Sequence, residues 1–210
     1  MRIALINENS QADKNGVIYE QLKQAADKYG HKIINLGKYS KEEDRNVPYT
    51  EIGLLASAVI ATGMAEMVVT GCGTGQGAAI SCNSMPNLVC GIIHSPLDMY
   101  LFSQINAGNV VSLPYSQKFG WGSEVELLQI FDILCSEEFG KGYPEEYAVS
   151  QKSSRIHMSE IKKDVGKDLL AIYKKYEKNI KEMINSTFKE NFIKYHNDSE
   201  VTNYLLSLIE

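Results

Sequence analysis

Residues 67–77 have the sequence MVVTGCGTGQG, in which a short apolar run passes directly into a loop with glycine at every second position. The apolar part, Met67–Thr70, predicts a buried strand. The glycines at 71, 73, 75 and 77 let the backbone approach a ligand closely, because they carry no Cβ atom. A strand that ends in such a loop is typical of a parallel α/β sheet, whose ligands bind at the carboxyl ends of the strands.

Outward from this stretch, short apolar runs alternate with segments of helical periodicity. We expect four further strands, over 3–6, 32–36, 88–93 and 109–113. Helices are expected over 17–29 and 50–60, from about Gly77, from the Ser95-Pro96 cap to Gly108, and from the Ser123 capping box to about Leu134. The alternation predicts an α/β fold, a three-layer α/β/α sandwich with a five-stranded parallel sheet of flavodoxin or Rossmann type.

The composition changes after residue 140. We expect residues 1–140 to form the α/β domain and residues 141–210 to form a helical C-terminal extension, which has too few apolar residues for an independent core. A connecting loop is predicted near 150–154, a long amphipathic helix over about 161–184 and a last helix over 199–209. Two roles remain open for the extension, packing on the sheet of its own chain or forming a dimer contact.

Charge and composition exclude several classes of function. The net charge of −5 argues against nucleic acid as a main partner, which usually requires a basic face. No apolar run is long enough for a membrane span or a signal peptide, so we expect a cytoplasmic protein. The four cysteines lack the spacing of a zinc site, and we expect neither a metal nor another cofactor.

The glycine loop itself indicates a chemistry. In the commonest five-strand order, strands 1 and 3 lie side by side, so Asn7-Glu8-Asn9 and the loop at 71–77 face one crevice. The loop N–H groups can bind a phosphate or an oxyanion, and the same positive potential stabilises a thiolate at Cys72. Such a thiolate can act as a base beside amides that stabilise an enediolate. A tight turn with a buried cysteine, or a plain phosphate cradle, is the alternative.

Two motifs give the sequence a family resemblance. Val69–Gly77 is followed by Ile80 and Asn83, and a second motif reads Asn106-Ala107-Gly108-Asn109-Val110. With the turn at Asn46–Tyr49, residues 1 to about 136 resemble the sugar-phosphate isomerases of the ribose-5-phosphate isomerase B and galactose-6-phosphate isomerase family. The resemblance implies a flavodoxin-like sandwich and aldose–ketose interconversion through a cis-enediolate without a metal. It also implies a homodimer, or a higher homo-oligomer, with active sites at the subunit interface.

The resemblance also assigns roles to residues. Cys72 matches the base of the cysteine-type members, whereas the glutamate of the other type is matched by Ala78. Glu8 stands where the family has an aspartate that holds substrate hydroxyls, and Asn106 matches an asparagine on the substrate oxygens. The oxyanion loop is matched by Thr74 and by the amides of Gly73, Gly75 and Gly77.

The departures from the family concern ring opening and phosphate binding. Ile105 replaces the ring-opening histidine, and Asn9 replaces a second histidine. In place of phosphate-binding arginines, the chain has Gln117-Lys118, Lys152 and Arg155. The substrate could therefore be too short to close a ring, such as a tetrose 4-phosphate. Alternatively His94 opens the ring, unless it is a core or loop histidine whose hydrogen bonds are all made within the protein. Trp121 could cap the pocket or fill an insertion.

The main hypothesis is an isomerase that interconverts the aldose and ketose forms of a small sugar phosphate, with Cys72 as the base and with Glu8, Asn9, Asn106, His94 and Arg155 among the substrate-binding residues. One alternative is a sugar-phosphate-binding module without isomerase activity. The other is an isomerase of an unphosphorylated sugar.

Overall fold

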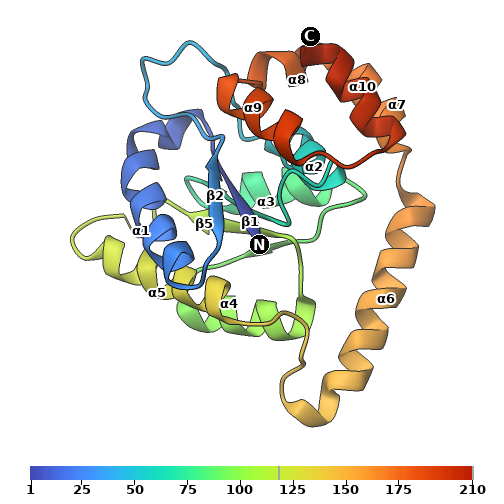
Figure 1. The fold of residues 1–210 in the computed structure, drawn as a ribbon. Coiled ribbons are helices and arrows are strands. Elements are labelled where there is room, and N and C mark those ends of the chain that lie inside the picture. Colours follow the sequence, from blue (N-terminus) through green and yellow to red (C-terminus); the bar gives the residue numbers. More distant parts are fainter. Residues whose placement is uncertain (118, 210) are drawn as a thin grey trace.

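The computed structural model describes residues 1–117 and 119–209, and a five-stranded parallel sheet forms its centre (Figure 1). The strands are β1 (Arg2–Asn7), β2 (Lys32–Asn35), β3 (Met67–Cys72), β4 (Cys90–Ile92) and β5 (Val110–Pro114). Their order in the sheet is β2-β1-β3-β5-β4. The α/β class and the five parallel strands expected from the sequence are confirmed.

The strand order places a switch point between β1 and β3. The chain passes from β1 to β2 on one side and then to β3 on the other, so Asn7 at the end of β1 lies opposite Gly71 at the end of β3. In such sheets, ligands bind outside the carboxyl ends of the strands at the switch point. The last two strands are exchanged relative to the flavodoxin order 2-1-3-4-5, because β5 inserts between β3 and β4.

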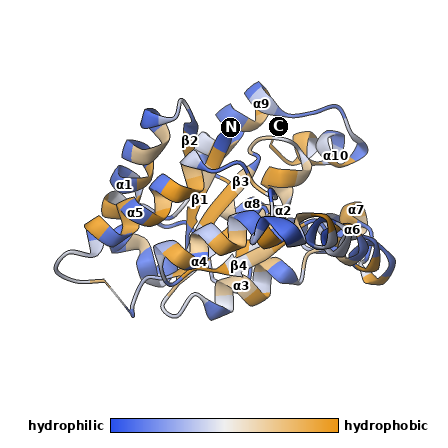
Figure 2. Ribbon diagram, turned by 90° about the horizontal axis from the view of Figure 1, so that it is seen from below, coloured by the Kyte–Doolittle hydropathy of each residue, from blue (hydrophilic) through white to orange (hydrophobic). Residues whose placement is uncertain are grey.

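Helices cover both faces of the sheet. On one face lie α1 (Asn15–Lys28), α4 (Pro96–Leu101) and α5 (Ser123–Ser136), and their core includes Leu5, Val69 and Leu113. On the other lie α2 (Ile52–Ala61) and α3 (Gln76–Asn83), and their core includes Ile6 and Val68. Successive strand residues thus alternate between the two cores. Figure 2 shows the apolar strands between the helical layers, which confirms the three-layer sandwich.

Two helix ends differ from the sequence expectation. Ser95 caps α4 as expected, because its Oγ accepts a hydrogen bond from the N–H of Asp98 at 3.1 Å. That helix continues as a π-turn, η2 (Phe102–Asn106), and ends at Ala107 with φ of 47°, one residue before Gly108. The N-cap of α5 is Gly122, which has no side chain to cap the helix, and Ser123 is already the first helical residue, so the predicted capping box at Ser123 is wrong.

The C-terminal extension contains shorter helices than its periodicity predicts. They are η3 (Glu145–Tyr147), α6 (Ala148–Val165), α7 (Leu169–Lys175), α8 (Glu177–Met183), α9 (Ser186–Tyr195) and α10 (Glu200–Ile209). The loop predicted at 150–154 is wrong, since these residues lie inside α6. The single helix predicted over 161–184 is also wrong. It is interrupted after Val165 by Gly166, and Asp168 caps a new helix through the N–H of Ala171 at 2.9 Å.

The extension has two parts with different surroundings. Helices α7–α10 pack on α2 and share its apolar core through Tyr173, Ile180, Phe188, Phe192 and Leu205. By contrast, α6 projects beside the body of the molecule (Figure 1), and none of its 18 residues is buried. Among the described residues, no helix combines the length and the apolar character that a membrane crossing requires.

Candidate active site

The glycine loop after β3 is packed tightly against β5. Cys72 lies opposite Pro114, and a Cβ atom on Gly71 would lie 2.3 Å from the carbonyl oxygen of Leu113. Any side chain at 71 would therefore push the two strands apart. The loop turns into α3 at Gly75, which has φ of +75° and whose carbonyl accepts a 2.7 Å hydrogen bond from the Ser112 hydroxyl.

The loop presents unpaired hydrogen-bond donors. Within residues 1–117 and 119–209, the N–H groups of Gly73, Thr74 and Gly75 donate to no other protein group. The Thr74 hydroxyl is turned back and accepts from the N–H of Gln76 at 3.3 Å. These N–H groups directly precede the positive N-terminus of α3. Such an arrangement binds a phosphate or the oxyanion of an enediolate.

Cys72 ends β3 at the base of this loop. Its side chain is a free thiol, 7% exposed, and belongs to the core that β3 shares with α2 and α3. A thiol at this position lies beside the loop N–H groups and is shielded from bulk water. The geometry can serve proton transfer at a substrate carbon whose oxygen is held by the loop.

The end of β1 closes a second side of the site. The Glu8 carboxylate is 3% exposed and accepts hydrogen bonds from the N–H of Ser10 at 2.7 Å and from the Ser10 hydroxyl. The Asn9 side chain accepts from the N–H of Val47 at 2.8 Å, which holds the turn at 46–49 against the strand ends. Both residues reach the expected edge of the sheet, and both side chains are engaged by the protein itself.

The hydrogen bond between Val47 and Asn9 holds the turn at 46–49 so that Tyr49 lies over α3, the helix that follows the loop. A Cβ atom on Gly77 would lie 2.6 Å from the Tyr49 ring, so glycine at 77 makes room for the aromatic side chain. The family resemblance predicts a role for the Gly77 amide in the oxyanion loop, and the structure adds this packing reason for glycine. Tyr49 itself is half exposed and borders the site.

A polar cluster that the sequence did not reveal lies on the third side. Lys14 donates hydrogen bonds from Nζ to Gln11 Oε1 at 2.7 Å and to the carbonyl of Tyr115 at 2.8 Å, with the Ser116 hydroxyl at 3.3 Å. Ser116 in turn donates its N–H to the Gly73 carbonyl at 2.9 Å. Gln11 and Lys14 come from the 3-10 helix η1 (Asn9–Lys14), whose sequence carries no recognisable binding pattern.

Asn106 and Arg155 are not brought to Cys72. Val110 at the start of β5 pairs with Val68, whereas Pro114 at its end pairs with Cys72. Asn106 precedes β5 and therefore lies at the opposite edge of the sheet. Arg155 lies there too, because its guanidinium donates to the carbonyls of Ile105 at 2.8 Å and Gly140 at 3.0 Å. Both residues line a groove beneath α6.

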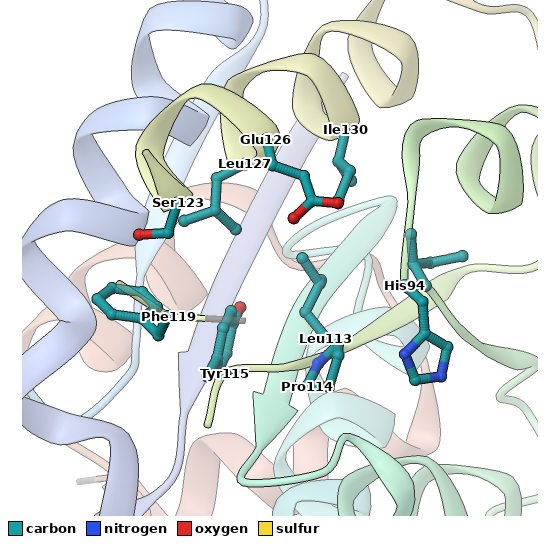
Figure 3. Close-up of a pocket in the computed structure, with 10 residues that line it drawn as sticks. His94, Leu113, Pro114, Tyr115, Phe119, Ser123, Glu126, Leu127 and Ile130 are labelled. Atoms are coloured by element: carbon teal, nitrogen blue, oxygen red, sulfur yellow. The ribbon is translucent and has the colours of Figure 1, made fainter. Parts of the chain in front are cut away.

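The remaining candidates lie elsewhere. His94 follows β4 and lines a separate pocket between β5 and α5, which Tyr115 and Glu126 also line (Figure 3). Trp121 is fully exposed and is not among the residues that line that pocket, so its side chain does not cap it. Lys152 is exposed on α6. Lys118 lies outside the described residues.

Comparison with known proteins decides the family. A sequence profile described as Ribose/Galactose Isomerase matches residues 3–146, which is more than half of the chain. The chain belongs to this family. As a member of the ribose/galactose isomerase family, it is an enzyme of the aldose–ketose isomerase type, and the family resemblance seen in the two sequence motifs is confirmed.

Two solved structures resemble this isomerase over its whole length. A 4-deoxy-L-threo-5-hexosulose-uronate ketol-isomerase complexed with a tartrate is 44% identical, covers 100% of this chain and 99% of its own, and has a TM-score of 0.95. A ribose-5-phosphate isomerase from Vibrio parahaemolyticus is 36% identical, covers 99% of both chains and has a TM-score of 0.94.

A ribose-5-phosphate isomerase B from Clostridium thermocellum shares the fold alone, at 21% identity. It covers 78% of this chain and 99% of its own, with a TM-score of 0.61. No curated protein matches the sequence.

Proposed function

We propose that this isomerase interconverts the aldose and ketose forms of an unphosphorylated sugar acid. The observation that carries the proposal is the full-length similarity, at 44% identity, to a protein named as a uronate ketol-isomerase. The similarity includes the C-terminal helices as well as the glycine loop. The sugar-phosphate substrate first inferred from the sequence has less support, since the relative named for ribose 5-phosphate is 36% identical.

The arginines support an unphosphorylated substrate. Arginine forks are the usual partners of phosphate groups. Arg2 is bound to Glu66 and to the carbonyls of Gly63 and Met64, which precede β3. Arg45 donates to the carbonyls of Leu36 and Gly37, and Arg155 donates to those of Ile105 and Gly140. The three arginines thus have backbone partners, and within residues 1–117 and 119–209 none bonds to the glycine loop of its own chain.

The geometry suggests the following proton transfer. Cys72, as thiolate, removes the proton from C2 of the aldose, and the electron pair forms the C1=C2 double bond of a cis-enediolate. Negative charge gathers on the former carbonyl oxygen, where the N–H groups of Gly73, Thr74 and Gly75 stabilise it. The thiol returns the proton to C1, and the proton on O2 passes to O1, which leaves a carbonyl at C2 and a hydroxyl at C1 and completes the ketose. This sequence needs no redox partner, because hydrogen only moves within the substrate.

Activity on paired substrates tests the proposal. A 5-keto-4-deoxyuronate, an unmodified uronate, and tetrose, pentose and hexose phosphates should be compared by proton exchange in deuterated water. We expect exchange at C1 or C2 only with the sugar acids. Exchange confined to a sugar phosphate would exclude the proposed substrate class. Ligand-induced stabilisation by sugar phosphates without exchange in any sugar would instead favour the binding-module alternative.

Substitution of Cys72 tests the base. Cys72→Ala should lower kcat by about a hundred- to ten-thousand-fold, since general base catalysis contributes about that much. Cys135→Ala is the matched control, because Cys135 lies in the core on the other face of the sheet. Thermal unfolding should show both variants folded. A Cys72→Ala enzyme with kcat near that of the wild type would remove Cys72 from the mechanism.

We further propose that a second copy of the chain completes each site. Asn106, which the resemblance assigns to the substrate oxygens, lies at the far edge of its own sheet. Five apolar side chains of α6, the helix that carries Arg155, are exposed: Val149, Ile156, Met158, Ile161 and Val165. Apolar surface on a projecting helix is typical of a subunit contact. A homodimer would bury this surface and bring Asn106 of one copy toward Cys72 of the other.

A further inference from the structure

The cation at the rim of the glycine loop is Lys14. Its ammonium contacts three neutral acceptors, Gln11 Oε1, the Tyr115 carbonyl and the Ser116 hydroxyl. The Phe119 ring lies on another side, with its centroid 5.0 Å from Nζ. The two short contacts fix the position of the positive charge, and the contact with the Ser116 hydroxyl, at 3.3 Å, is long enough for a ligand oxygen to take that donor.

The charge of Lys14 has no counter-ion among residues 1–117 and 119–209. The two acidic residues that act on it are occupied elsewhere: Asp13 forms an ion pair with Lys41 at 2.9 Å, and Glu8 accepts from Ser10. Burial lowers the pKa of Lys14 despite the attraction of these carboxylates. A partly desolvated cation without an ion pair is unfavourable in the empty protein and gains most from a bound anion.

This cation lies next to the reacting position. The Ser116 N–H donates to the Gly73 carbonyl, and the Ser116 hydroxyl lies 3.5 Å from the place that a Cβ on Gly73 would occupy. Gln11 Nε2 lies 4.0 Å from the same point. Gln11 is buried, and its amide also donates to the Ser10 hydroxyl at 2.7 Å. A short sugar whose C1 and C2 lie at Cys72 can therefore extend its other end to this cluster.

We propose that Lys14, supported by Ser116 and Gln11, binds the carboxylate of the sugar acid and so selects this substrate class. The assignment rests on the proposed function, since it concerns the same site. A single ammonium beside a hydroxyl and an amide suits a singly charged carboxylate. A phosphate dianion usually engages several cations or an arginine fork, which the described part of this cluster lacks.

The steady-state test compares a sugar acid with its neutral counterpart. Lys14→Met keeps an unbranched side chain as far as the ε position and removes the ammonium with its charge. We expect KM for the 5-keto-4-deoxyuronate to rise about 10- to 100-fold with kcat nearly unchanged, the signature of lost uniform binding. KM for the analogue with a C6 alcohol should stay the same, and Lys14→Arg should restore part of the affinity. Equal effects on both substrates would overturn the assignment and indicate a structural role.

Lys41→Met is the matched control. It removes the same charge from an exposed lysine close to Lys14 without touching the cluster. The KM for the sugar acid should change less than threefold in this variant. A rise in KM as large as that of Lys14→Met would mean that the overall positive potential of the surface attracts the acid, without a specific contact. That result would overturn the assignment.

A binding experiment separates this inference from the proposed reaction. Calorimetric titration of the Cys72→Ala enzyme with galacturonate, galactose and galactose 6-phosphate requires no turnover. We expect galacturonate to bind most tightly and to lose this preference over galactose when Lys14→Met is added. That result supports the carboxylate site even if no uronate is isomerised. Tighter binding of galactose 6-phosphate than of galacturonate, or a galacturonate preference that survives Lys14→Met, would overturn it.

Discussion

Gly75 shapes the loop through its backbone conformation. Its φ of +75° is strained for any residue with a side chain, and a Cβ there would lie 3.2 Å from the carbonyl carbon of Leu113. We expect Gly75→Ala to lower the free energy of unfolding by about 1–3 kcal/mol, from the left-handed strain and the crowding of β5. Because the adjacent N–H groups would be re-aimed, kcat should fall as well. Urea denaturation and steady-state kinetics measure both effects.

Gly16→Ala is the control for this substitution. Gly16 lies in α1, and a Cβ there would meet no atom within 4 Å. Alanine should therefore be neutral or stabilise the protein by up to about 1 kcal/mol, through helix propensity and a less flexible unfolded chain. If Gly75→Ala behaves like Gly16→Ala, the loop tolerates other conformations and the preorganisation argued for its N–H groups is wrong.

At the residue scale, the sequence reveals groups whose chemistry is unusual in themselves. A cysteine among alternating glycines is visible without a structure, and so is a motif such as Asn106–Val110. Lys14 and Ser116 could not be found in this way, because their significance comes from separate segments that meet only in the fold. For Glu8, the sequence predicts the position of the residue but not the hydrogen bonds of its side chain. Its place at the site edge was predictable, but its engagement with Ser10 depends on the turn that follows β1.

At the element scale, one buried hydroxyl joins the extension to the sandwich. The Tyr173 hydroxyl on α7 lies 2.6 Å from Ser57 Oγ on α2, and Ser57 in turn donates to Asn87 at 2.6 Å. Tyr173→Phe should lower the free energy of unfolding by about 1–3 kcal/mol, because Ser57 loses a buried partner. Tyr176→Phe, at an exposed neighbouring position, should change it by less than about 0.5 kcal/mol. Urea denaturation followed by circular dichroism compares them; equal losses would show that the hydroxyl contact contributes nothing.

The helices of the extension show why periodicity predicted the wrong lengths. Apolar residues recur every three or four positions from Ile161 to Ile184, which is the pattern of one long amphipathic helix. The chain instead turns at Gly166 and Tyr176, and the shorter helices still direct apolar side chains such as Ile180 to α2. Gly166 and Asp168 are residue types that end and begin helices, so the sequence did contain signals for a break between two helices. Their effect depends on the apolar surface that α2 offers, which local sequence does not contain.

At the scale of the whole molecule, the layers were predictable and the strand order was not. Alternating strands and helices determine a covered parallel sheet, and the adjacency of β1 and β3 follows from the commonest topology. The insertion of β5 between β3 and β4 depends on tertiary packing, including Gly71 against Leu113. That insertion sets where the segment before β5 emerges. The separation of Asn106 from Cys72 within one chain follows from strand direction instead, because Asn106 precedes β5 whereas Cys72 ends the parallel strand β3.

The apolar surface of α6 gives a first test of the proposed dimer. Val149 and Ile156 are 83% and 53% exposed, so replacing both by glutamate should leave the isolated fold intact. We expect this variant to be monomeric in sedimentation velocity at micromolar concentration, because two carboxylates would be placed in the contact. Lys152→Glu, an exposed charge change on the same helix, should leave the oligomer unchanged. Sedimentation of the wild type as a monomer would remove the proposal.

Mixing two inactive variants tests whether each site draws on both copies. If Cys72 and Asn106 of one site come from different subunits, a heterodimer of Cys72→Ala with Asn106→Ala contains one site with both substitutions and one with neither. Random exchange makes about half of the dimers heterodimers, so the mixture should regain roughly a quarter of the wild-type activity. Activity after subunit exchange is the measurement, and each variant treated alone is its control. A mixture no more active than its separate components would mean that Asn106 does not act on the partner's Cys72, although the two residues lie at opposite edges of their own sheet.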